Sequence, residues 1–519
     1  MTILAVSISA DTPERACLQI EQAVRQGAEA VELRLDFLRA PDAPSAAGLV
    51  RFAKSKGVGV VATCRHPSEG GAAALPEDKR LAVLTASLES GADFADWEFA
   101  HYLPVREALS AALRRNPASR LILSVHNFKG PFEDLTARYE AVRAVCPTAV
   151  VKLAYAARHI HDCFEGLDLL EREKSGAIVL GMGPAGAITR VLAKKLGGFL
   201  TFACLDEGSA AAPGQIPLEK MKTLYRWDAI DGQTEVYGIV GFPLGHSLSP
   251  MVYNGCFEAE GRNAIFLPFE VEGGPSELNE FFQSVLERPW LHCRGFSVTL
   301  PHKTSMLEFV RREGGFADGP AERIGAANTL KIGYNGMLSA YNTDCVGAMD
   351  ALTQTLGLDR HQLRNLEVAV LGAGGAARAV VAGLREAGCR VTVYNRTVQK
   401  AVALAEEFGC RAAPLEEVRN SSAAVFINCT SIGMTPHTDA SPVPAEVFGP
   451  DKAAFDTVYN PLRTRFLREA EAAGARIVYG AEMFIRQAVA QYRHLVGAEP
   501  DEERIRQIVF RHLQPEGCS

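Results

Sequence analysis

Short apolar runs alternate with amphipathic segments through the first 225 residues of the chain. Eight of these runs are rich in β-branched and aromatic residues and predict strands; they span residues 3–9, 30–38, 59–66, 94–99, 120–128, 150–157, 177–183 and 199–206. The segments between them carry apolar residues at helical spacing, as in 14–28 and 133–145. Strands that alternate with helices run parallel, and eight such units are typical of a (β/α)8 barrel. A doubly wound open sheet is the alternative that this pattern leaves open.

A second α/β region follows residues 228–235, a short polar stretch that is the best domain boundary in the chain. Residues 366–397 combine an apolar strand, a glycine-rich turn, a helix and a second strand. In that context Gly372-x-Gly374-x-x-Ala377 predicts a dinucleotide-binding Rossmann unit, because glycines let the backbone approach a pyrophosphate at the helix N-terminus. A tight structural turn is the alternative. Other strands are predicted at 264–271, 295–300 and 328–332.

The end of the second Rossmann strand bears on the choice of dinucleotide. An acidic residue there would bind the ribose 2′-hydroxyl of NAD, whereas this chain has Asn395, Arg396 and Thr397. Arg396, with Lys400 nearby, should attract a 2′-phosphate. The sequence therefore favours NADP, the alternative being an arginine that faces only solvent.

Composition and charge narrow the class of protein. The chain has 519 residues, 47% of them hydrophobic and 22% charged, which predicts two to four globular domains. A net charge of −7 argues against nucleic acid or an anionic membrane as partner. No apolar run reaches the ~18 residues of a membrane span, and the N-terminus lacks the pattern of a secretory signal. The twelve cysteines form no C-x-x-C motif and suit free thiols, so we expect a cytoplasmic protein.

Lys152 is the most informative single residue, because it interrupts the apolar strand AVVKLAY. Burial disfavours an ammonium ion and leaves the free amine that imine chemistry requires. The alternatives are a lysine that reaches out of the barrel or one paired with a carboxylate such as Glu98. His126 ends the preceding strand and could act as a general base beside an imine.

Three arginines accompany this lysine and histidine near strand ends. Arg34, Arg65 and Arg190 lie on or just after predicted strands. Functional groups of a barrel gather at the C-terminal ends of its strands, and guanidinium groups suit carboxylates. The set predicts a site for an anionic carbonyl compound; solvated surface charge is the alternative.

Six motifs in the first half occur in the order found in a known family. They are E-L-R-L-D (32–36), T-C-R-x3-E-G-G (63–71), S-V-H (124–126), V-K-L-A (151–154), G-x2-T-R (186–190) and A-P-G-Q-I (212–216). Together they resemble type I 3-dehydroquinate dehydratase over residues 1–225. The resemblance implies a Schiff base between Lys152 and the C3 ketone of 3-dehydroquinate, with His126 removing a C2 proton and assisting loss of the C1 hydroxyl.

The same resemblance assigns the remaining residues of the first site. It implies that Glu69 orients groups near the reaction and that substrate contacts come from Ser7, Glu32, Arg34, Arg65, Arg190 and Gln215. Two positions depart from the family pattern. Ala211 stands where a serine is usual, and Thr189 stands where a serine is usual before the arginine.

The second half carries a comparable series of motifs. They are Gly241-x-Pro243-x3-Ser247-x-Ser249-Pro250, S-V-T-L-P-x-K (297–303), G-A-A-N-T-L (325–330), Y-N-T-D (341–344), N-x-T-S-x-G-M (428–434), D-x-V-Y-x-P (456–461) and G-x2-M-x3-Q (480–487). The series resembles shikimate dehydrogenase over residues 236–515. The resemblance implies a catalytic pair of Lys303 and Asp344. Cys345 and Thr457 depart from the family pattern, which commonly has glycine and methionine there.

Ligand contacts of the second half also come from this resemblance. It implies that substrate is bound by Ser247, Ser249, Thr299, Asn328, Tyr459 and Gln487. It implies that the cofactor is bound by Gly372, Ala373, Gly374, Gly375, Ala376, Asn395, Arg396, Thr397, Lys400, Thr457 and Gly480. A metal ion is not expected at either site.

The two resemblances together define the expected architecture. The fold class is α/β, with an N-terminal (β/α)8 barrel followed by a two-lobed dehydrogenase made of a substrate domain and a Rossmann NADP-binding domain. The expected domains are the barrel (1–228), the substrate domain (235–345), the Rossmann domain (346–479) and C-terminal helices that return to the substrate domain (480–519). No oligomeric state is predicted.

The two activities that these resemblances imply are consecutive. Loss of water from 3-dehydroquinate gives 3-dehydroshikimate, which the second half would reduce to shikimate with NADPH. One rival hypothesis is that the second half prefers quinate or NAD. Another is a metabolite-binding regulator without catalysis, which should have lost Lys152, His126, Lys303 or Asp344.

Overall fold

The computed structural model of the chain describes residues 2–174, 176–245, 247–359 and 361–514. The density of contacts between residues divides the chain into two units. The first comprises residues 1–235 and 263–271, and the second comprises residues 236–262 and 272–519. Within the described residues, no helix is long and apolar enough to span a membrane. Cys518 lies outside the described residues.

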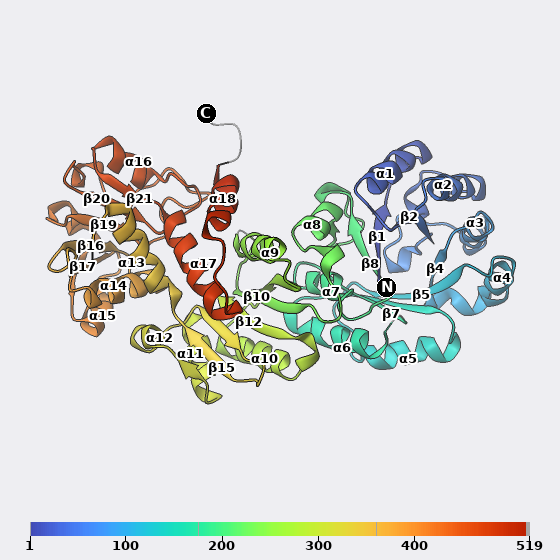
Figure 1. The fold of residues 1–519 in the computed structure, drawn as a ribbon. Coiled ribbons are helices and arrows are strands. Elements are labelled where there is room, and N and C mark those ends of the chain that lie inside the picture. The colour runs from blue at the N-terminus through green and yellow to red at the C-terminus, as the bar shows by residue number, and fades with distance from the viewer. Residues whose placement is uncertain (1, 175, 246, 360, 515–519) are drawn as a thin grey trace. The chain divides into compact units, whose positions relative to one another are not determined.

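The first unit is a ring of parallel strands (Figure 1). Its strands are β1 (Ile3–Ile8), β2 (Ala30–Arg34), β3 (Gly59–Thr63), β4 (Phe94–Glu98), β5 (Arg120–Asn127), β6 (Val150–Ala156), β7 (Ala177–Met182), β8 (Leu200–Cys204) and β9 (Ile216–Pro217). They are ordered β7-β6-β5-β4-β3-β2-β1-β8-β9, so β1 lies between β2 and β8. Next to β8, the backbone N–H of Phe199 donates to the carbonyl of Ala177 at 2.8 Å. The predicted (β/α)8 barrel is confirmed, and the open doubly wound sheet is wrong for this half.

Helices follow the barrel strands, as the alternating pattern predicts. They are α1 (Pro13–Arg25), α2 (Ala43–Ser55), α3 (Glu77–Glu89), α4 (Tyr102–Arg115), α5 (Leu135–Val145), α6 (Phe164–Arg172), α7 (Ala187–Leu192) and α8 (Leu218–Thr223). Side chains of Thr12, Asp42 and Asp134 accept hydrogen bonds from the first turns of α1, α2 and α5. Helix α8 ends at Thr223, and Arg226 beyond it has a left-handed φ of 52°.

A six-stranded mixed sheet follows the barrel strands in sequence. It contains β10 (Glu235–Gly241), β11 (Ala264–Glu270), β12 (Cys293–Val298), β13 (Phe316–Ala317), β14 (Thr329–Ile332) and β15 (Leu338–Tyr341), in the order β11-β10-β12-β14-β15-β13. Its region of the chain also contributes α9 (Ser249–Ala259), α10 (Pro275–Leu286), α11 (Lys303–Arg312), α12 (Gly319–Ile324) and α13 (Thr343–Leu356). Strands β12 and β14 pair antiparallel, which places Ser297 opposite Thr329.

A second six-stranded sheet is wholly parallel. It contains β16 (Glu367–Leu371), β17 (Arg390–Asn395), β18 (Arg411–Pro414), β19 (Val425–Asn428), β20 (Ala453–Asp456) and β21 (Arg476–Val478), in the order β18-β17-β16-β19-β20-β21. The intervening helices are α14 (Gly375–Glu386), α15 (Val398–Phe408) and α16 (Arg465–Ala472). The chain reverses direction across the sheet between β16 and β19, which is the switch point where Rossmann sheets bind dinucleotides.

Two long helices end the described chain, α17 (Gly480–Val496) and α18 (Glu502–Leu513). Helix α17 packs along α13 and against β12 and β14, while α18 packs against α9 and α17. The approach of α13 to α17 depends on Gly347, because a Cβ atom there would lie 2.8 Å from the Cβ of Gln487. In α18, Ile505 and Val509 are fully buried, as its amphipathic pattern predicts.

Candidate active sites

A cavity with about 550 Å³ of empty space, part of it open to solvent, lies at the carboxyl ends of the barrel strands. The predicted residues that line it are Glu32, Arg34, Arg65, Glu69, His126, Lys152, Arg190 and Gln215. Phe128, Met182 and Phe202 supply apolar walls. The barrel therefore brings side chains from distant parts of the sequence into one pocket, at the end where (β/α)8 barrels carry their sites.

Lys152 lines this cavity and is only 4% exposed. Its Nζ atom lies 2.9 Å from Oδ2 of Asp96, 3.6 Å from Oε1 of Glu32 and 4.3 Å from the centre of the Phe202 ring. The lysine thus neither leaves the barrel nor pairs with Glu98. Two carboxylates, those of Asp96 and Glu32, therefore face its amino group.

Asp96 is the charged residue that sequence reasoning missed. It is fully buried, and its carboxylate receives both Arg65 nitrogens, at 3.1 and 2.8 Å, and the Ser124 hydroxyl at 2.6 Å. Burial alone would raise the pKa of this carboxyl, but the charges of Arg65 and Lys152 hold it well below its ordinary value. The alternation Asp96-Trp97-Glu98 was the available signal, because residues two apart in a strand share a face.

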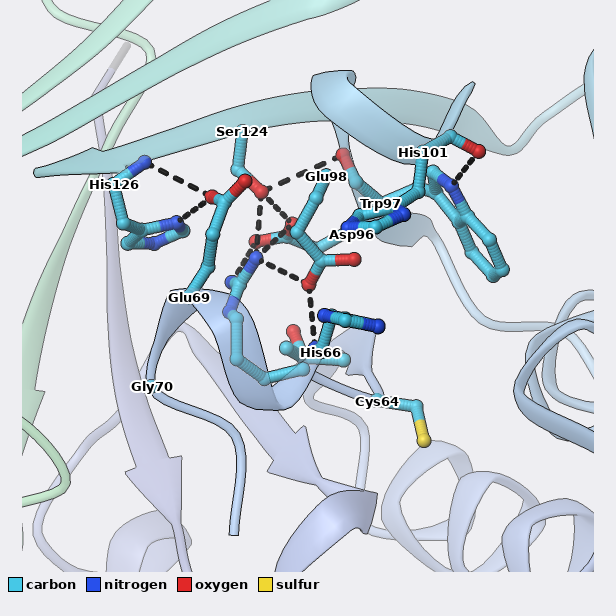
Figure 2. A network of polar contacts seen from close by, with 12 residues as sticks. Cys64, His66, Glu69, Gly70, Asp96, Trp97, Glu98, His101, Ser124 and His126 are labelled. Carbon is cyan, nitrogen blue, oxygen red and sulfur yellow. Dashed lines mark hydrogen bonds and ion pairs between the residues drawn. The ribbon is translucent and has the colours of Figure 1, made fainter. Parts of the chain in front are cut away.

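Glu69 and His126 form a second buried pair at the cavity wall (Figure 2). Oε2 of Glu69 lies 2.9 Å from Nδ1 of His126 and accepts the backbone N–H of His126 at 3.0 Å. Burial lowers the pKa of His126 well below 6.5, and Arg65 and Lys152 lower it further. His126 is therefore a neutral imidazole at physiological pH, the form that can accept a proton.

The pKa of Glu69 is moved in the opposite direction. Burial raises it to about 7, the negative charge of Glu98 adds to the rise, and Arg65 and the backbone N–H of His126 oppose it. A carboxyl that titrates near neutrality beside a neutral histidine can take up and return protons at working pH. The pair therefore has the properties required for acid–base chemistry.

Arg190 also lines the cavity and offers it a hydrogen-bond donor. Arg190 is 1% exposed, and its Nε atom has no hydrogen-bond partner among the described residues. Burial lowers the pKa of Arg190 to about 10, so the side chain remains charged at neutral pH. A buried, charged donor without a partner is suited to an anionic ligand.

Hydroxyl and amide groups form a chain beside this arginine. Nε2 of Gln215 donates to Oγ of Ser7 at 2.9 Å, and Ser7 donates to Oε2 of Glu32 at 2.7 Å. Thr63 donates to the other oxygen of Glu32 at 3.1 Å. Arg34 is held in a two-bond pair with Asp36. These contacts fix the polar groups of the pocket before any ligand binds.

The second unit contains a separate lysine–aspartate pair. Nζ of Lys303, at the start of α11, lies 2.5 Å from Oδ2 of Asp344, at the start of α13. Nδ2 of Asn328 donates to the other oxygen of Asp344 at 3.0 Å. The Asn328 carbonyl in turn accepts Nε2 of Gln491 at 2.8 Å. The structure thus joins Lys303, Asp344 and Asn328 as one group, and Gln491 is a neighbour that the sequence did not indicate.

The other predicted substrate residues of this unit occupy separate structural settings. Ser249 begins α9, and its backbone N–H donates to Oγ of Ser247 at 3.3 Å. The backbone N–H of Thr299 donates to the carbonyl of Val240 at 2.9 Å. Gln487 lies on α17 against Gly347, so α17 carries it to α13, the helix of Asp344. The ring of Tyr459 packs 5.1 Å from that of Phe484.

The first turn of α14 forms a cradle for a dinucleotide. Gly372 has φ +107°, and a Cβ atom on Gly374 or Gly375 would meet no atom within 4 Å. Gly374 caps α14 without a side-chain hydrogen bond, so the helix N-terminus stays open to a phosphate. Ala373 and Ala376 pack on the core of this sheet. The residues present therefore fit the pyrophosphate of a dinucleotide.

Basic side chains follow β17, where the adenosine ribose of a dinucleotide would lie. Arg396 and Lys400 are exposed, and Nδ2 of Asn395 donates to the carbonyl of Thr397 at 2.9 Å. Across the switch point, Oγ1 of Thr457 donates to the carbonyl of Asn428 at 2.9 Å. Gly480 is required by close packing, because a Cβ there would lie 2.4 Å from the Val458 oxygen.

A search of the described residues finds no group of three or more His, Cys, Asp or Glu side chains that could hold a metal ion.

Comparisons with known families cover both halves of the chain. The model of type I 3-dehydroquinase matches residues 4–231. The model of the shikimate dehydrogenase substrate binding domain matches residues 239–330, and that of shikimate/quinate 5-dehydrogenase matches residues 355–437.

Individual relatives extend this finding. The chloroplastic bifunctional 3-dehydroquinate dehydratase/shikimate dehydrogenase of Arabidopsis thaliana is 32% identical over 530 residues, which cover 98% of this chain and 85% of that protein. The chain belongs to the bifunctional dehydratase/shikimate dehydrogenase family. The NADP(+) shikimate dehydrogenase of Methanosarcina mazei is 39% identical over 54% of this chain and 99% of its own length. A crystal structure of a shikimate dehydrogenase in complex with NADP+ matches with a TM-score of 0.50 and 33% identity, over 55% of this chain and 98% of that one.

Two residues of this family member depart from the dehydratase pattern, and the structure shows what each does. Thr189 uses its hydroxyl within the fold, accepting from the N–H of Gly181 at 2.9 Å and donating to the Gly186 carbonyl at 2.8 Å. Ala211 lines the cavity without a hydroxyl, but its backbone N–H donates to Oε1 of Gln215 at 2.7 Å. Gln215 is therefore oriented by the backbone of the residue that lacks the usual side chain.

The dehydrogenase half of the family member has two departures of its own. Cys345 follows Asp344 and is buried with Ile324 and Ala379. The hydroxyl of Thr457 donates a hydrogen bond to the backbone carbonyl of Asn428. Both side chains are thus engaged in packing or in backbone contacts of the dehydrogenase half.

Proposed function

We propose that the chain catalyses two consecutive reactions, with the residues named below. The first is the dehydration of 3-dehydroquinate to 3-dehydroshikimate through a Schiff base on Lys152. The second is the NADPH-dependent reduction of 3-dehydroshikimate to shikimate by the second half. The observation that carries the proposal is the position of Lys152, whose Nζ faces a cavity beside the Glu69–His126 pair in a chain of the bifunctional family.

Formation of the Schiff base requires Lys152 to lose a proton before its nitrogen attacks the C3 carbonyl. Asp96 is a poor acceptor for that proton, because Arg65 and Lys152 hold its pKa down. The Glu69–His126 pair is the better acceptor, since Glu69 titrates near neutrality and His126 is neutral. Condensation of the amine with the ketone takes this proton back from the pair, releases water and leaves an iminium ion.

The iminium ion draws electrons away from C2 and makes the C2 proton removable. His126 takes this proton at Nε2, with its Nδ1–H donated to Glu69. The electron pair then expels the C1 hydroxyl, which leaves as water with a proton from the same pair. Arg190 binds the substrate carboxylate through its free guanidinium edge, and the Gln215–Ser7–Glu32 chain receives substrate hydroxyls. Hydrolysis of the iminium releases the product and restores Lys152.

The second site is arranged to stabilise charge on a carbonyl oxygen. The glycine-rich first turn of α14 would hold NADPH, which would supply the hydride for the substrate carbonyl carbon. Lys303 gives a proton to the carbonyl oxygen, and Asp344 holds the lysine side chain in place. Asn328 orients Asp344, while Ser247 and Ser249 bind the substrate carboxylate. Arg396 and Lys400 bind the 2′-phosphate of the coenzyme.

The rival hypotheses make different demands on the chain. A non-catalytic regulator should lack one of the reactive groups, yet Lys152, His126, Lys303 and Asp344 are all present and the two lysine–carboxylate pairs are formed. Use of quinate or NAD by the second half is tested by turnover with both acids and both coenzymes. The exposed Arg396 and Lys400, together with the Ser247-x-Ser249 pair, support shikimate and NADP.

The decisive experiment starts from 3-dehydroquinate and NADPH in one vessel. The proposal expects NADPH consumption and shikimate formation by the unaided chain. Borohydride added with 3-dehydroquinate alone should leave a covalent mass adduct on Lys152. The contrary result is a chain that reduces added 3-dehydroshikimate and yet gives no adduct and no dehydration. That result would contradict the dehydratase activity and leave only the dehydrogenase.

A cytoplasmic location is proposed on separate grounds. The eleven cysteines within the described residues are all free, which suits a reducing compartment. Fractionation of the native cells with the two activities as markers tests this location.

A further inference from the structure

A buried charged network adjoins the Glu69–His126 pair (Figure 2). Glu98 is at its centre and is fully buried at the carboxyl end of β4. Neither Glu98 nor its partner Arg80 lines the cavity, so neither is placed to contact substrate. The dehydration steps derived above use neither residue. A buried carboxylate outside the site still requires an explanation, because burying a charge is costly unless the charge is paired.

Glu98 holds the end of strand β3 and the turn that follows it. Its Oε1 atom accepts NH1 of Arg65 at 2.9 Å and the backbone N–H of His66 at 3.0 Å. Its other oxygen accepts NH2 of Arg80. Two of these three donors belong to consecutive residues at the start of the turn that carries Glu69.

Arg80 reaches the same turn from helix α3. It is fully buried, its Nε donates to the carbonyl of Cys64 at 2.9 Å, and its guanidinium lies 4.4 Å from the Trp97 ring centre. Glu98 and Arg80 together therefore fix the backbone on both sides of Arg65, at the Cys64 carbonyl and the His66 N–H.

The fixed segment leads directly to Glu69. The backbone N–H groups of Glu69 and Gly71 each donate to the His66 carbonyl at 3.0 Å, which closes the turn. A side chain at position 71 is excluded, because a Cβ atom there would lie 2.0 Å from the Arg65 oxygen. Glu98 therefore helps to fix the position of the Glu69 carboxylate on His126, because it binds the backbone at the start of the closed turn that carries Glu69.

Glu98 also acts on Glu69 through its charge. The groups that face Glu69 are Arg65 from the end of β3, Asp96 and Glu98 from β4, and His126 from β5; Arg34 from β2 contacts the next residue at the Gly70 carbonyl. Among them, Glu98 is the carboxylate that most raises the pKa of Glu69. His66, whose backbone Glu98 binds, has its own pKa lowered by burial and by His101, so it is uncharged near neutral pH.

We propose that Glu98, held by Arg80, is a positioning residue for the dehydration. It fixes the turn that places Glu69 on His126, and its charge opposes ionisation of Glu69, so that the pair exchanges protons near neutral pH. The inference rests on the proposed dehydratase function and deepens it. Without Glu98, Lys152 still forms the Schiff base. The proton transfers are then carried out by a Glu69–His126 pair in which the position and the pKa of Glu69 are altered.

The test is the pH dependence of kcat/KM for 3-dehydroquinate in the full-length Glu98→Gln variant. Glutamine keeps an oxygen for the His66 N–H and removes the charge. His126 needs an ionised Glu69 to accept its Nδ1–H, so activity rises with pH through the pKa of Glu69, about 7. In the variant the midpoint of this rise should move to lower pH by about half a unit or more.

Two further variants separate charge from position. Arg80→Lys keeps the charges but loses the fork that binds the Cys64 carbonyl and Glu98 together. It should lower kcat several-fold with the midpoint unchanged. Glu107→Gln, an exposed residue on α4, is the matched control and should alter neither quantity.

Folding is controlled within the same molecule. Borohydride trapping with 3-dehydroquinate counts the competent Lys152 sites, and kcat is expressed per trapped site. Removing one partner of a buried pair can unfold a protein; if Glu98→Gln traps poorly, the double variant Glu98→Gln/Arg80→Gln removes both charges and must show the same downward shift.

The outcomes distinguish the two proposals. A midpoint that stays in place, or moves up, in a variant with normal trapping overturns the role of Glu98. A merely structural role would lower the number of trapped sites at every pH without moving the midpoint. Failure of the wild-type chain to trap 3-dehydroquinate would instead overturn the proposed dehydratase function.

Discussion

Oε2 of Glu69 receives two nitrogens of one residue, Nδ1 of His126 at 2.9 Å and the backbone N of His126 at 3.0 Å. Both contacts favour the carboxylate, yet burial and the charge of Glu98 raise the pKa of Glu69 to about 7. The two contacts orient the imidazole. Burial and Glu98 raise the pKa of Glu69 while Arg65 and the His126 N–H lower it, so the pair gains or loses a proton near pH 7. The rate of dehydration should therefore depend on pH near neutrality.

We expect kcat/KM for dehydration to rise through about pH 7 and to level off above it. The sign follows because a raised pKa keeps Glu69 protonated on the acidic side, where it cannot accept the Nδ1–H of His126. Glu69→Gln should abolish this titration and lower dehydration about a hundredfold or more. Initial rates of 3-dehydroshikimate formation between pH 5.5 and pH 9 measure both effects. A wild-type profile that is flat across pH 7 would contradict the assignment.

The two lysines should be separable within one chain. Lys152→Ala should lower dehydration at least about a thousandfold while leaving reduction of 3-dehydroshikimate intact, because only the first reaction needs the nucleophile. Lys303→Ala should do the reverse. Each half then serves as the folding control for the other. Loss of both activities in either variant would show that the substitution acts on the fold instead.

Arg190 should affect binding of 3-dehydroquinate more than turnover. Lysine keeps a positive charge but loses the guanidinium edge, so Arg190→Lys should raise KM about tenfold with a kcat change of less than about threefold. Arg115→Lys, an exposed arginine paired with Glu89 on the same barrel, is the control. Steady-state dehydration kinetics give both constants. An unchanged KM in Arg190→Lys would remove this residue from the carboxylate site.

Arg396 should set the preference for NADP. Arg396→Asp removes a charge that attracts the 2′-phosphate and adds one that repels it, so KM for NADPH should rise about tenfold or more while KM for NADH falls or stays constant. Arg419→Asp, also exposed in this sheet region, controls for the change of net charge. Reduction of 3-dehydroshikimate is followed with each coenzyme. Equal effects of the two substitutions would rule out a specific contact.

Asp456 should make the stability of the second unit depend on pH. It is buried, it accepts from Thr464 at 2.6 Å and from Asn428 at 3.0 Å, and burial raises its pKa to about 7, from 3.8. The fold thus prefers the protonated form, and the stability this provides is complete below about pH 4 and is lost as pH rises through about 7.

Asp456→Asn should remove that dependence, because asparagine is neutral at every pH. Between about pH 5.5 and pH 8 the wild-type unit should lose about 2 kcal/mol more stability than the variant. Dehydrogenase activity that survives heating at the two pH values, relative to unheated enzyme, reports the difference. Parallel losses in wild type and variant would exclude Asp456 as the cause.

The strand pattern favoured the barrel over the open sheet, because eight alternating strand–helix units are typical of a (β/α)8 barrel. The motifs also indicated which side chains meet at the strand ends. The partner of Lys152 could not be predicted, since nothing local to position 152 indicates that Asp96, rather than Glu98, lies 2.9 Å from its nitrogen. That contact depends on the register and twist that the whole ring imposes on β4 and β6.

The same limit applies to the end of the barrel and to the second site. Residues 217–227 could form one helix by sequence alone, whereas α8 ends at Thr223 and the backbone of Arg226 is left-handed. Gln491 was not singled out, although it binds the Asn328 carbonyl, because its contact spans 163 positions of sequence. Local periodicity carries no information about contacts of this range.

Gly347 allows two helices of the proposed second site to pack closely, because it has no Cβ atom. Its missing Cβ lets the helix that begins with Thr343 and Asp344 touch the helix that carries Gln487. Any larger residue would push these helices apart and displace Asp344 and Gln487, two residues of the proposed second site, in a single step. We therefore expect the packing of α13 on α17 to admit only glycine at position 347, even though the glycine itself takes no part in the chemistry.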